Sequence, residues 1–518
     1  MTTLPIIQFF KLYATQFRLV LVSALLSLTA LTLFHFPIKK MPLYGDDFLL
    51  VRDSLSPGDY SSVDQLFWLT GAGKWRPIST VPLVLMGRMF GYQIAPFMIV
   101  NLVLLVFVAL MAAKITLQIT KNRNSFYGML IITIVSEFTW LSLTSVYGVM
   151  ELLSLLFLLI GISLLVKTGL NDFTDVRLIP LSAFFILLAS LSHERFLIVA
   201  FPIWLSLLVF AKDSRTRLAA HTFLLVPSIR IFVSGFILNI DFLTGGGESQ
   251  IRTNSDTWIL VHLLDSFKMM LGFQSGTGKF YGDSTLENIA RANDLGLIAL
   301  AFYIPLVLYL ILRPRQFRAV LQHCQVGSMK FLITLLLTSC VSLAIISSTV
   351  LERTEGRWIF GPFLLFAICT FAMLASSTEV SSSSGINLRT VLLIFALLMP
   401  SLVYRKDHTD FTLLRDQVVN SITQLESHEG TEEHWGLIIS QSDLTMPVNW
   451  QFAYGKAFNQ LANPPDFIDF VSGDSPCPIL RISYVCINLV LSNQPNPIIK
   501  VLDSPPHTDD HLRQPRTK

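Results

Sequence analysis

Residues 94–113 read IAPFMIVNLVLLVFVALMAA, a run without a charged side chain. At 1.5 Å of rise per residue, about 20 apolar residues in a helix cross the hydrocarbon core of a bilayer. The run therefore predicts a membrane-spanning helix, and the chain contains further apolar runs of similar length.

The composition agrees with a membrane protein. Of the 518 residues, 52% are hydrophobic and only 14% are charged, whereas soluble domains carry about 25% charged residues. A net charge of +3 is too small to indicate nucleic-acid binding. Further apolar runs lie at residues 18–36, 126–144, 147–166, 178–191, 196–211, 218–240, 295–312, 331–350, 358–376 and 388–404. The sequence thus predicts an all-α polytopic membrane protein with about eleven transmembrane helices, not a barrel of short alternating strands.

The basic residues predict the orientation of these spans. If the N-terminus is cytoplasmic and the spans alternate, the basic residues gather in the inner loops, as the positive-inside rule requires. We therefore expect a multi-pass protein of the inner or plasma membrane, with an uncleaved first span and an extracytoplasmic C-terminal tail. The basic residues assigned to the inner side are Lys114, Lys121, Arg123, Lys167, Arg177, Lys212, Arg215, Arg217, Arg313, Arg315, Arg318, Lys330 and Arg389.

The polar segments divide the chain into two predicted domains. Residues 1–404 form the membrane domain, with long outer loops at 37–92 and 241–294, the second carrying an amphipathic stretch at 258–273 that lies along the interface. Residues 405–518 form a tail that we expect to be a small α+β domain, with a β-like run at 479–485. Two cysteines in this tail, Cys477 and Cys486, either form a disulfide or stay as buried thiols.

The first outer loop opens with an acidic pair in Tyr44-Gly45-Asp46-Asp47-Phe48. In an extended segment adjacent side chains point to opposite sides, so one carboxylate can face a reacting group while the other holds the backbone or a partner. Two like charges this close raise the pKa of one carboxyl, which suits a general base. The alternative is an Asp-rich turn in a hydrated loop.

Two cationic motifs fall on the same predicted face. Lys74-Trp75-Arg76-Pro77 ends the first outer loop and can hold a phosphate, although basic residues beside an interfacial Trp also occur as simple membrane anchors. In Glu352-Arg353-Thr354-Glu355-Gly356-Arg357, the two arginines share a face if the turn is helical, and the acids could orient them. The alternative for this second motif is a charged cap between two spans.

A third charged motif, His193-Glu194-Arg195, joins two spans with almost no loop. Its functional interpretation is a contact to an acceptor or a phosphate, which we favour for Glu194. Its structural interpretation, favoured for His193, is an ion pair of Glu194 with Arg195 or His193 that closes a helical hairpin. Glu151 adds an acid near the outer end of the fourth span, and acids inside spans are functional candidates.

In its layout, residues 1–405 resemble the GT-C superfamily of integral membrane glycosyltransferases. One span is followed by an outer loop that opens with Asp46-Asp47, where that superfamily keeps its catalytic Asp, and about ten further spans precede a soluble tail. Trp75-Arg76-Pro77 and the turns at Ser192-His193-Glu194 and Glu352–Arg357 also resemble bacterial members. The resemblance implies a donor sugar linked to polyprenyl phosphate and an acceptor glycan, lipid or protein on the outer face.

The chemistry that this resemblance implies needs one base and several cations. Asp46 is the first choice for the base and Asp47 the alternative, in a single displacement that inverts the anomeric carbon. The residues expected to contact the donor phosphate or the acceptor are Lys74, Arg76, Glu194, Arg353, Glu355 and Arg357. Some relatives use a divalent metal at the acidic pair, and the sequence does not distinguish that mode from metal-free catalysis. Rival functions are an O-antigen polymerase or ligase, a transporter or flippase of lipid-linked sugars, and a structural or sensory membrane protein whose active part is the tail.

Overall fold

A computed structural model describes the bulk of the membrane domain and four strands of the tail. The described residues are 51, 75–91, 93–237, 258–273, 294–314, 318, 322, 324–349, 356–375, 388–403, 435–441, 467–472, 485–491 and 498–502. The described helices belong to one compact unit and the four strands to a second. The predicted first span and the acidic pair Asp46-Asp47 lie outside the described residues.

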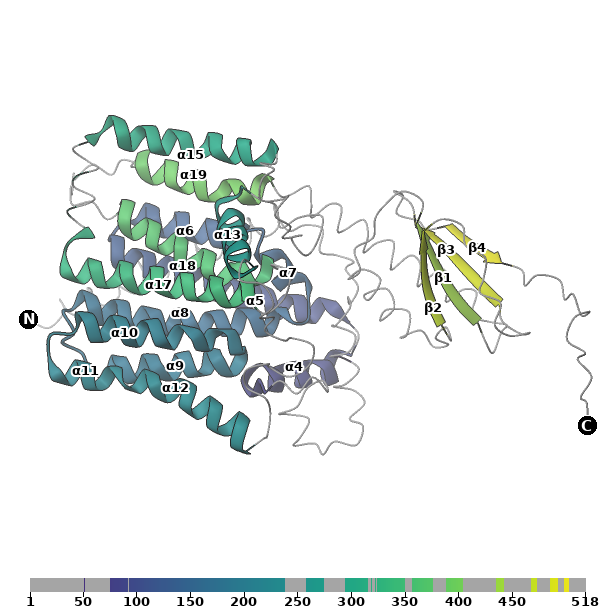
Figure 1. The fold of residues 1–518 in the computed structure, drawn as a ribbon, viewed down its shortest axis with the longest axis horizontal. Coiled ribbons are helices and arrows are strands. Elements are labelled where there is room, and N and C mark those ends of the chain that lie inside the picture. The colour runs from purple at the N-terminus through teal and green to yellow at the C-terminus, as the bar shows by residue number, and fades with distance from the viewer. Residues whose placement is uncertain are drawn as a thin grey trace, which may run out of the picture. The chain divides into compact units, whose positions relative to one another are not determined.

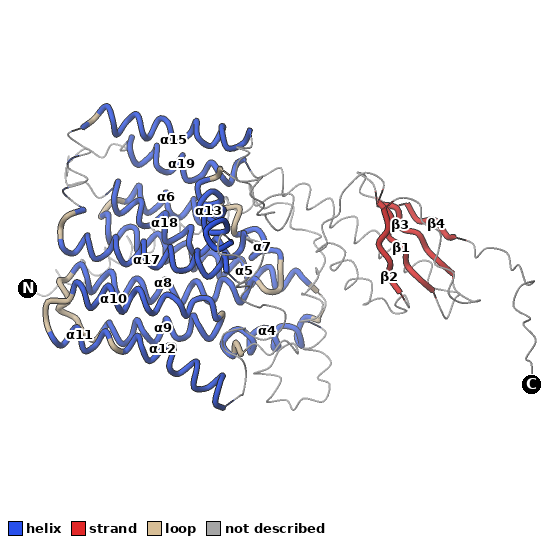
Figure 2. Tube along the Cα trace, in the orientation of Figure 1, coloured by secondary structure: helices blue, strands red, loops and turns tan. Residues whose placement is uncertain are grey.

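The helical unit is a bundle of apolar helices that run side by side (Figures 1 and 2). Helix α8 contacts α5 and α9, α12 contacts α9 and α10, and α17 contacts α10 and α18. The helices are α4 (Pro77–Phe90), α5 (Ile94–Thr120), α6 (Arg123–Val135), α7 (Thr139–Thr144), α8 (Gly148–Leu170), α9 (Leu178–Ser192), η2 (Glu194–Val199), α10 (Ala200–Phe210), α11 (Ser214–Ala220), α12 (Thr222–Ile231), η3 (Phe232–Ile237), α13 (Trp258–Leu271), α15 (Asp294–Leu312), α17 (Gly327–Thr349), α18 (Gly356–Ala375) and α19 (Leu388–Val403).

Four stretches in the described part of the chain are helical, long and apolar enough to cross a membrane: Ala95–Thr120, Gly148–Leu170, Ser214–Ile237 and Gly327–Ser347. Shorter apolar helices accompany them, and large side chains such as Phe236 (79% exposed) and Val209 (67% exposed) point away from the bundle. Soluble proteins seldom leave so much apolar surface open to solvent. The membrane character predicted from composition is thereby supported, while the total of about eleven spans stays a prediction.

Many predicted boundaries match the structure closely. The run at 178–191 corresponds to α9, the run at 388–404 to α19, and the amphipathic stretch at 258–273 to α13. Helices α5 and α8 continue past their predicted ends, to Thr120 and Leu170. The extension is physically reasonable because Lys114 and Lys167 have long aliphatic stems that let a helix emerge gradually from the membrane.

The predicted single span at 126–144 is wrong in one respect, because it is broken after α6. Ser136 leaves helical geometry at φ −52° and ψ 129°. Its carbonyl accepts hydrogen bonds from the Thr139 N–H (3.1 Å) and hydroxyl (2.6 Å), and the short helix α7 follows. Ser and Thr side chains offer the backbone local partners that compete with the helix, which apolar periodicity alone does not reveal.

Three further segments differ from simple spans. The predicted span at 196–211 begins earlier and as a 3₁₀ helix, η2, before α10. The predicted span at 218–240 starts in α11, continues through α12 and ends as the π-helix η3. Part of the predicted outer loop at 37–92 forms the apolar helix α4, whose Pro77 occupies the first turn, where its missing N–H costs nothing.

Small residues allow the helices to approach closely. Between α8 and α9 the Ser182 hydroxyl donates to the Gly161 carbonyl at 2.9 Å. At the start of α8, a Cβ on Gly148 would lie 1.6 Å from the carbonyl oxygen of Ser142. The amide of Asn101 in α5 lies beside it and donates to the Ser145 carbonyl at 2.8 Å. Gly148 therefore lets the α8 N-terminus seat against α5 and α7, as small residues do between membrane helices.

The described tail residues form a four-stranded sheet with the order β2-β1-β3-β4. Strand β1 pairs in parallel with β2 and β3, and β3 pairs antiparallel with β4. The strands are β1 (Trp435–Gln441), β2 (Phe467–Ser472), β3 (Val485–Leu491) and β4 (Ile498–Leu502). The strand predicted at 479–485 meets β3 only at Val485. Cys486 lies in β3 but Cys477 lies outside the described residues, so the disulfide and the α+β organisation stay predictions.

The Gly148 contact can be tested with a matched pair of variants. We expect Gly148→Ala to lower the free energy of unfolding by about 1–3 kcal/mol, because the added methyl group has no room. Gly361→Ala in α18 is the control, since a Cβ there would meet its neighbours at 3.7–3.8 Å, an ordinary contact distance. Thermal unfolding of both proteins in the same detergent measures the effect, and equal melting temperatures for the two variants would contradict the packing argument.

Candidate functional site

The Trp75-Arg76-Pro77 motif and the His193-Glu194 turn meet in an ion pair. The Arg76 Nε donates to Glu194 Oε2 at 2.6 Å, and Arg76 Nη2 donates to Glu194 Oε1. The remaining terminal nitrogen, Nη1, lies 3.0 Å from the sulfur of Met150. This bidentate contact joins residues 118 positions apart. Two motifs that the sequence predicted separately thus form one site at the start of α4 and the end of α9.

The turn between α9 and η2 has a defined geometry. His193 is extended (φ −152°, ψ 125°), and its Nδ1 accepts the backbone N–H of Arg195 at 3.4 Å, which caps η2. The Ser79 hydroxyl of α4 donates to the Ser192 carbonyl at 2.8 Å, which fixes α4 to the end of α9. The backbone that carries Glu194 is therefore held from both sides.

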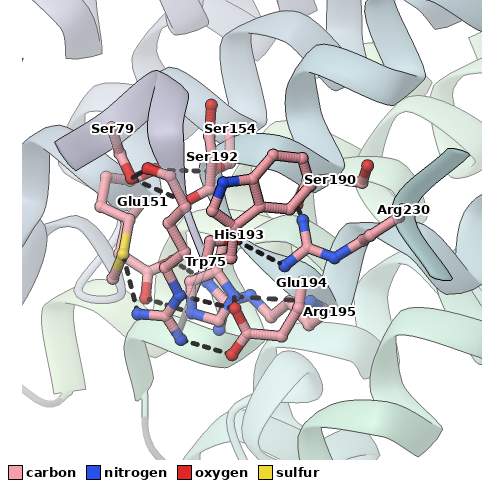
Figure 3. Close-up of polar contacts among 12 residues, drawn as sticks. Trp75, Ser79, Glu151, Ser154, Ser190, Ser192, His193, Glu194, Arg195 and Arg230 are labelled. Carbon is pink, nitrogen blue, oxygen red and sulfur yellow. Dashed lines mark hydrogen bonds and ion pairs between the residues drawn. The ribbon is translucent and has the colours of Figure 1, made fainter. Parts of the chain in front are cut away.

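A second ion pair lies deeper in the same cluster, between Arg195 Nη2 and Glu151 Oε2. Glu151 lies in the first turn of α8 and its side chain is only 4% exposed. The His193 ring stands between the two acids, with Nε2 3.7 Å from Glu151 and Nδ1 3.6 Å from Glu194 (Figure 3). The predicted contact of Glu194 with His193 is present at 3.6 Å, whereas Glu194 and Arg195 each have an ion-pair partner from another element, Arg76 and Glu151.

Arg230 completes the cluster and was missed by the sequence analysis. It lies in α12 and is 4% exposed. Its guanidinium donates to the carbonyl of Ser190 and, at 3.0 Å, to the carbonyl of Trp75, and it stands 6.0 Å from the Trp75 ring. Figure 3 shows it reaching toward the turn from the opposite side to Glu151. The signal that could have found it is an arginine inside a predicted span, which is costly and usually functional.

The cluster carries an excess of positive charge. Its members are three arginines (Arg76, Arg195 and Arg230) and two glutamates (Glu151 and Glu194), so the sum is +1 with His193 neutral. Burial raises the pKa of the Glu194 carboxyl, but Arg76, His193 and Arg230 outweigh burial and hold that pKa well below its ordinary value. Glu194 is therefore an anion surrounded by cations, and the place of its carboxylate suits negatively charged groups.

The predicted site residues have different outcomes. Arg76, Glu194 and Glu151 come together in the cluster. Asp46, Asp47, Lys74, Arg353 and Glu355 lie outside the described residues, and Arg357 is the second residue of α18 but its side chain is not described. Within the described residues no group of three His, Cys, Asp or Glu side chains is arranged to hold a metal ion. A metal at the acidic pair stays a prediction.

Two further basic residues lie at the other ends of α8 and α9. Lys167 lies in the last turn of α8 and Arg177 immediately precedes α9, whereas Glu151 and Glu194 lie near the opposite ends of these helical segments. The cluster and these basic residues are therefore a helix length apart. The location of the cluster on the outer side stays a prediction from the sequence.

The depressed pKa of Glu194 predicts a pH dependence. Above the ordinary carboxyl pKa of about 4.3 the ion pair contributes fully, and the contribution is lost as pH falls through the lower folded-state pKa. Wild type should therefore exceed Glu194→Gln in melting temperature by a constant amount from about pH 5 to pH 8, and the difference should shrink below about pH 4. Asp172→Asn, in the loop after α8, is the control; a difference that persists unchanged in acid would refute the ion-pair account.

The Glu151–Arg195 pair predicts strong coupling between the two residues. Glu151→Gln or Arg195→Met alone leaves a buried charge without its partner and should cost about 3–5 kcal/mol. The double variant removes both charges and should cost clearly less than the sum of the single variants. Unfolding in detergent gives the three values, and strict additivity would show that the pair does not act as a unit.

The comparison with known proteins gives no further lead, because no protein-family model and no curated protein matches this chain. The function is therefore inferred from the sequence motifs and from the charged cluster that joins Arg76, Glu151, His193, Glu194, Arg195 and Arg230.

Proposed function

We propose that this protein is a membrane glycosyltransferase that moves a sugar from a polyprenyl-phosphate donor to an extracytoplasmic glycan, lipid or protein. Asp46, or alternatively Asp47, acts as the general base. The cations of the cluster around Arg76 hold the donor phosphate. The protein is a multi-pass protein of the inner or plasma membrane, with its N-terminus in the cytoplasm and its tail outside.

The observation that carries the proposal is the contact between Arg76 and Glu194. It links the end of the first outer loop, which opens with the acidic pair, to the turn after α9. The loop that contains the proposed base therefore ends at a site with excess positive charge. A phosphate at the edge of the membrane needs such cations, and arginine binds it with two parallel hydrogen bonds.

The reaction needs one proton transfer and one leaving group. The acceptor hydroxyl oxygen attacks the anomeric carbon, its proton passes to the aspartate, and the bond from that carbon to the phosphate oxygen breaks. The electron pair stays on the departing phosphate, where the cations stabilise the added charge. Attack opposite to the leaving group inverts the anomeric carbon, so one catalytic carboxylate is enough.

Several arginines would contact the donor phosphate together. Arg76 can offer its fork to two phosphate oxygens, and Arg230 places a second positive charge close by through its bonds to the Trp75 and Ser190 carbonyls. Arg353 and Arg357 are proposed as a second cationic group, with Lys74 and Glu355 as further contacts. An Arg side chain suits this role better than Lys because its planar fork matches phosphate geometry.

The proposal is tested by replacing the acidic pair. We expect Asp46→Asn, or Asp47→Asn if that residue is the base, to lower sugar transfer by at least about 100-fold, because a general base contributes about 10²–10⁴-fold to rate. The measurement is the glycan modification restored to a deletion strain of the native host, with protein levels checked. Asp59→Asn, in the same loop, is the control. Full glycan modification by both the Asp46→Asn and the Asp47→Asn variant would rule out the proposed glycosyltransferase activity.

A further inference from the structure

The fork of Arg76 is already occupied. Glu194 accepts hydrogen bonds from both Nε and Nη2, and Nη1 lies against the sulfur of Met150. A phosphate cannot bind the Nε/Nη2 edge of Arg76 while Glu194 holds these two nitrogens, and the sulfur of Met150 lies against Nη1 of the other edge. If the donor phosphate binds the Nε/Nη2 edge, the Arg76–Glu194 pair must open first.

We propose that the Glu194 carboxylate occupies the binding position of a phosphate group, and that the phosphate of a polyprenyl-phosphate ligand binds by displacing Glu194 from Arg76. The inference rests on the proposed function and deepens it. Carboxylate and phosphate both present two oxygens to a guanidinium fork, so one can replace the other without changing the arginine.

The charges around Glu194 favour the exchange. Arg76 and Arg230 both act on this carboxylate, whereas the second acid, Glu151, is paired with Arg195. A single carboxylate leaves positive charge in excess. The phosphodiester of the intact donor carries one negative charge, whereas the polyprenyl phosphate released on transfer is a monoester with about 1.5–2 negative charges at neutral pH and three acceptor oxygens. The monoester therefore balances this group of cations better than Glu194 does.

The surroundings allow Glu194 to move while the frame stays fixed. The Glu194 side chain is 28% exposed, compared with 4% for Glu151 and 9% for Arg195. The backbone on both sides is held by the Arg230 bond to Trp75 and by the Ser79 bond to Ser192. The exchange therefore needs a rotation of the Glu194 side chain and no movement of the helices.

The experiment measures binding of farnesyl phosphate, with farnesol as the uncharged reference, to the full-length protein in detergent. Wild type should bind farnesyl phosphate more tightly than farnesol. Glu194→Gln, which removes the competing anion, should bind farnesyl phosphate about tenfold more tightly than wild type, with no change for farnesol. Asp172→Asn removes a carboxylate from the loop at the far end of α8 and should leave both affinities unchanged.

A second variant guards against a failure of Glu194→Gln to fold. Glu194→Asp keeps the charge but shortens the side chain by one methylene group, so its carboxylate no longer reaches both Arg76 nitrogens, and phosphate binding should again tighten. Arg76→Met should abolish the preference for farnesyl phosphate over farnesol.

The outcomes separate the two hypotheses. If wild type and the Glu194 variants bind farnesyl phosphate no better than farnesol, the phosphate role of the site and the proposed function are wrong. If wild type prefers farnesyl phosphate but Glu194→Gln and Glu194→Asp bind it equally or more weakly, the proposed function stands and the exchange is wrong.

Discussion

The ion pair between Arg76 and Glu194 is the contact on which the rest of this end of the molecule depends. It fixes the start of α4 against the turn after α9, and the hydroxyl of Ser79 and the guanidinium of Arg230 strengthen the same junction from two further elements. Charged groups inside a membrane protein are stable only when they face partners or water. The pairing therefore joins the start of α4 to the turn after α9, beside Glu151 of α8 and Arg230 of α12.

Much of the helical fold was predictable because a bilayer imposes a simple rule. A lipid environment requires each backbone polar group to be satisfied within the segment, so apolar length predicts a helix with good accuracy. The starts of α5, α9 and α19 follow directly from apolar runs. The break at Ser136 and the π-helix η3 were not predictable in this way, because they depend on hydrogen bonds of single residues and on neighbouring helices.

The candidate site was predictable in part and for a different reason. Alternation of the spans placed Arg76, Glu151 and Glu194 on one side, and the structure brings them into one cluster. The pairing inside the cluster could not be deduced, since Glu194 has Arg195 as its neighbour in sequence but Arg76 as its partner in space. Arg230 was missed because a hydropathy window averages one arginine into an apolar run. The acidic pair stays a prediction from the sequence.

The sequence separation of these contacts has a consequence for biogenesis. Arg76 enters the membrane region before its partner Glu194, 118 residues later in the chain, has been synthesised. Arg230, which donates to the carbonyl of Trp75, follows that residue by 155 positions. Until then Arg76 and Glu151 must remain solvated at the edge of the bilayer or pair with transient partners. The charged end of the bundle therefore closes only when α12 has been inserted, so a chain truncated before α12 would leave this end incomplete.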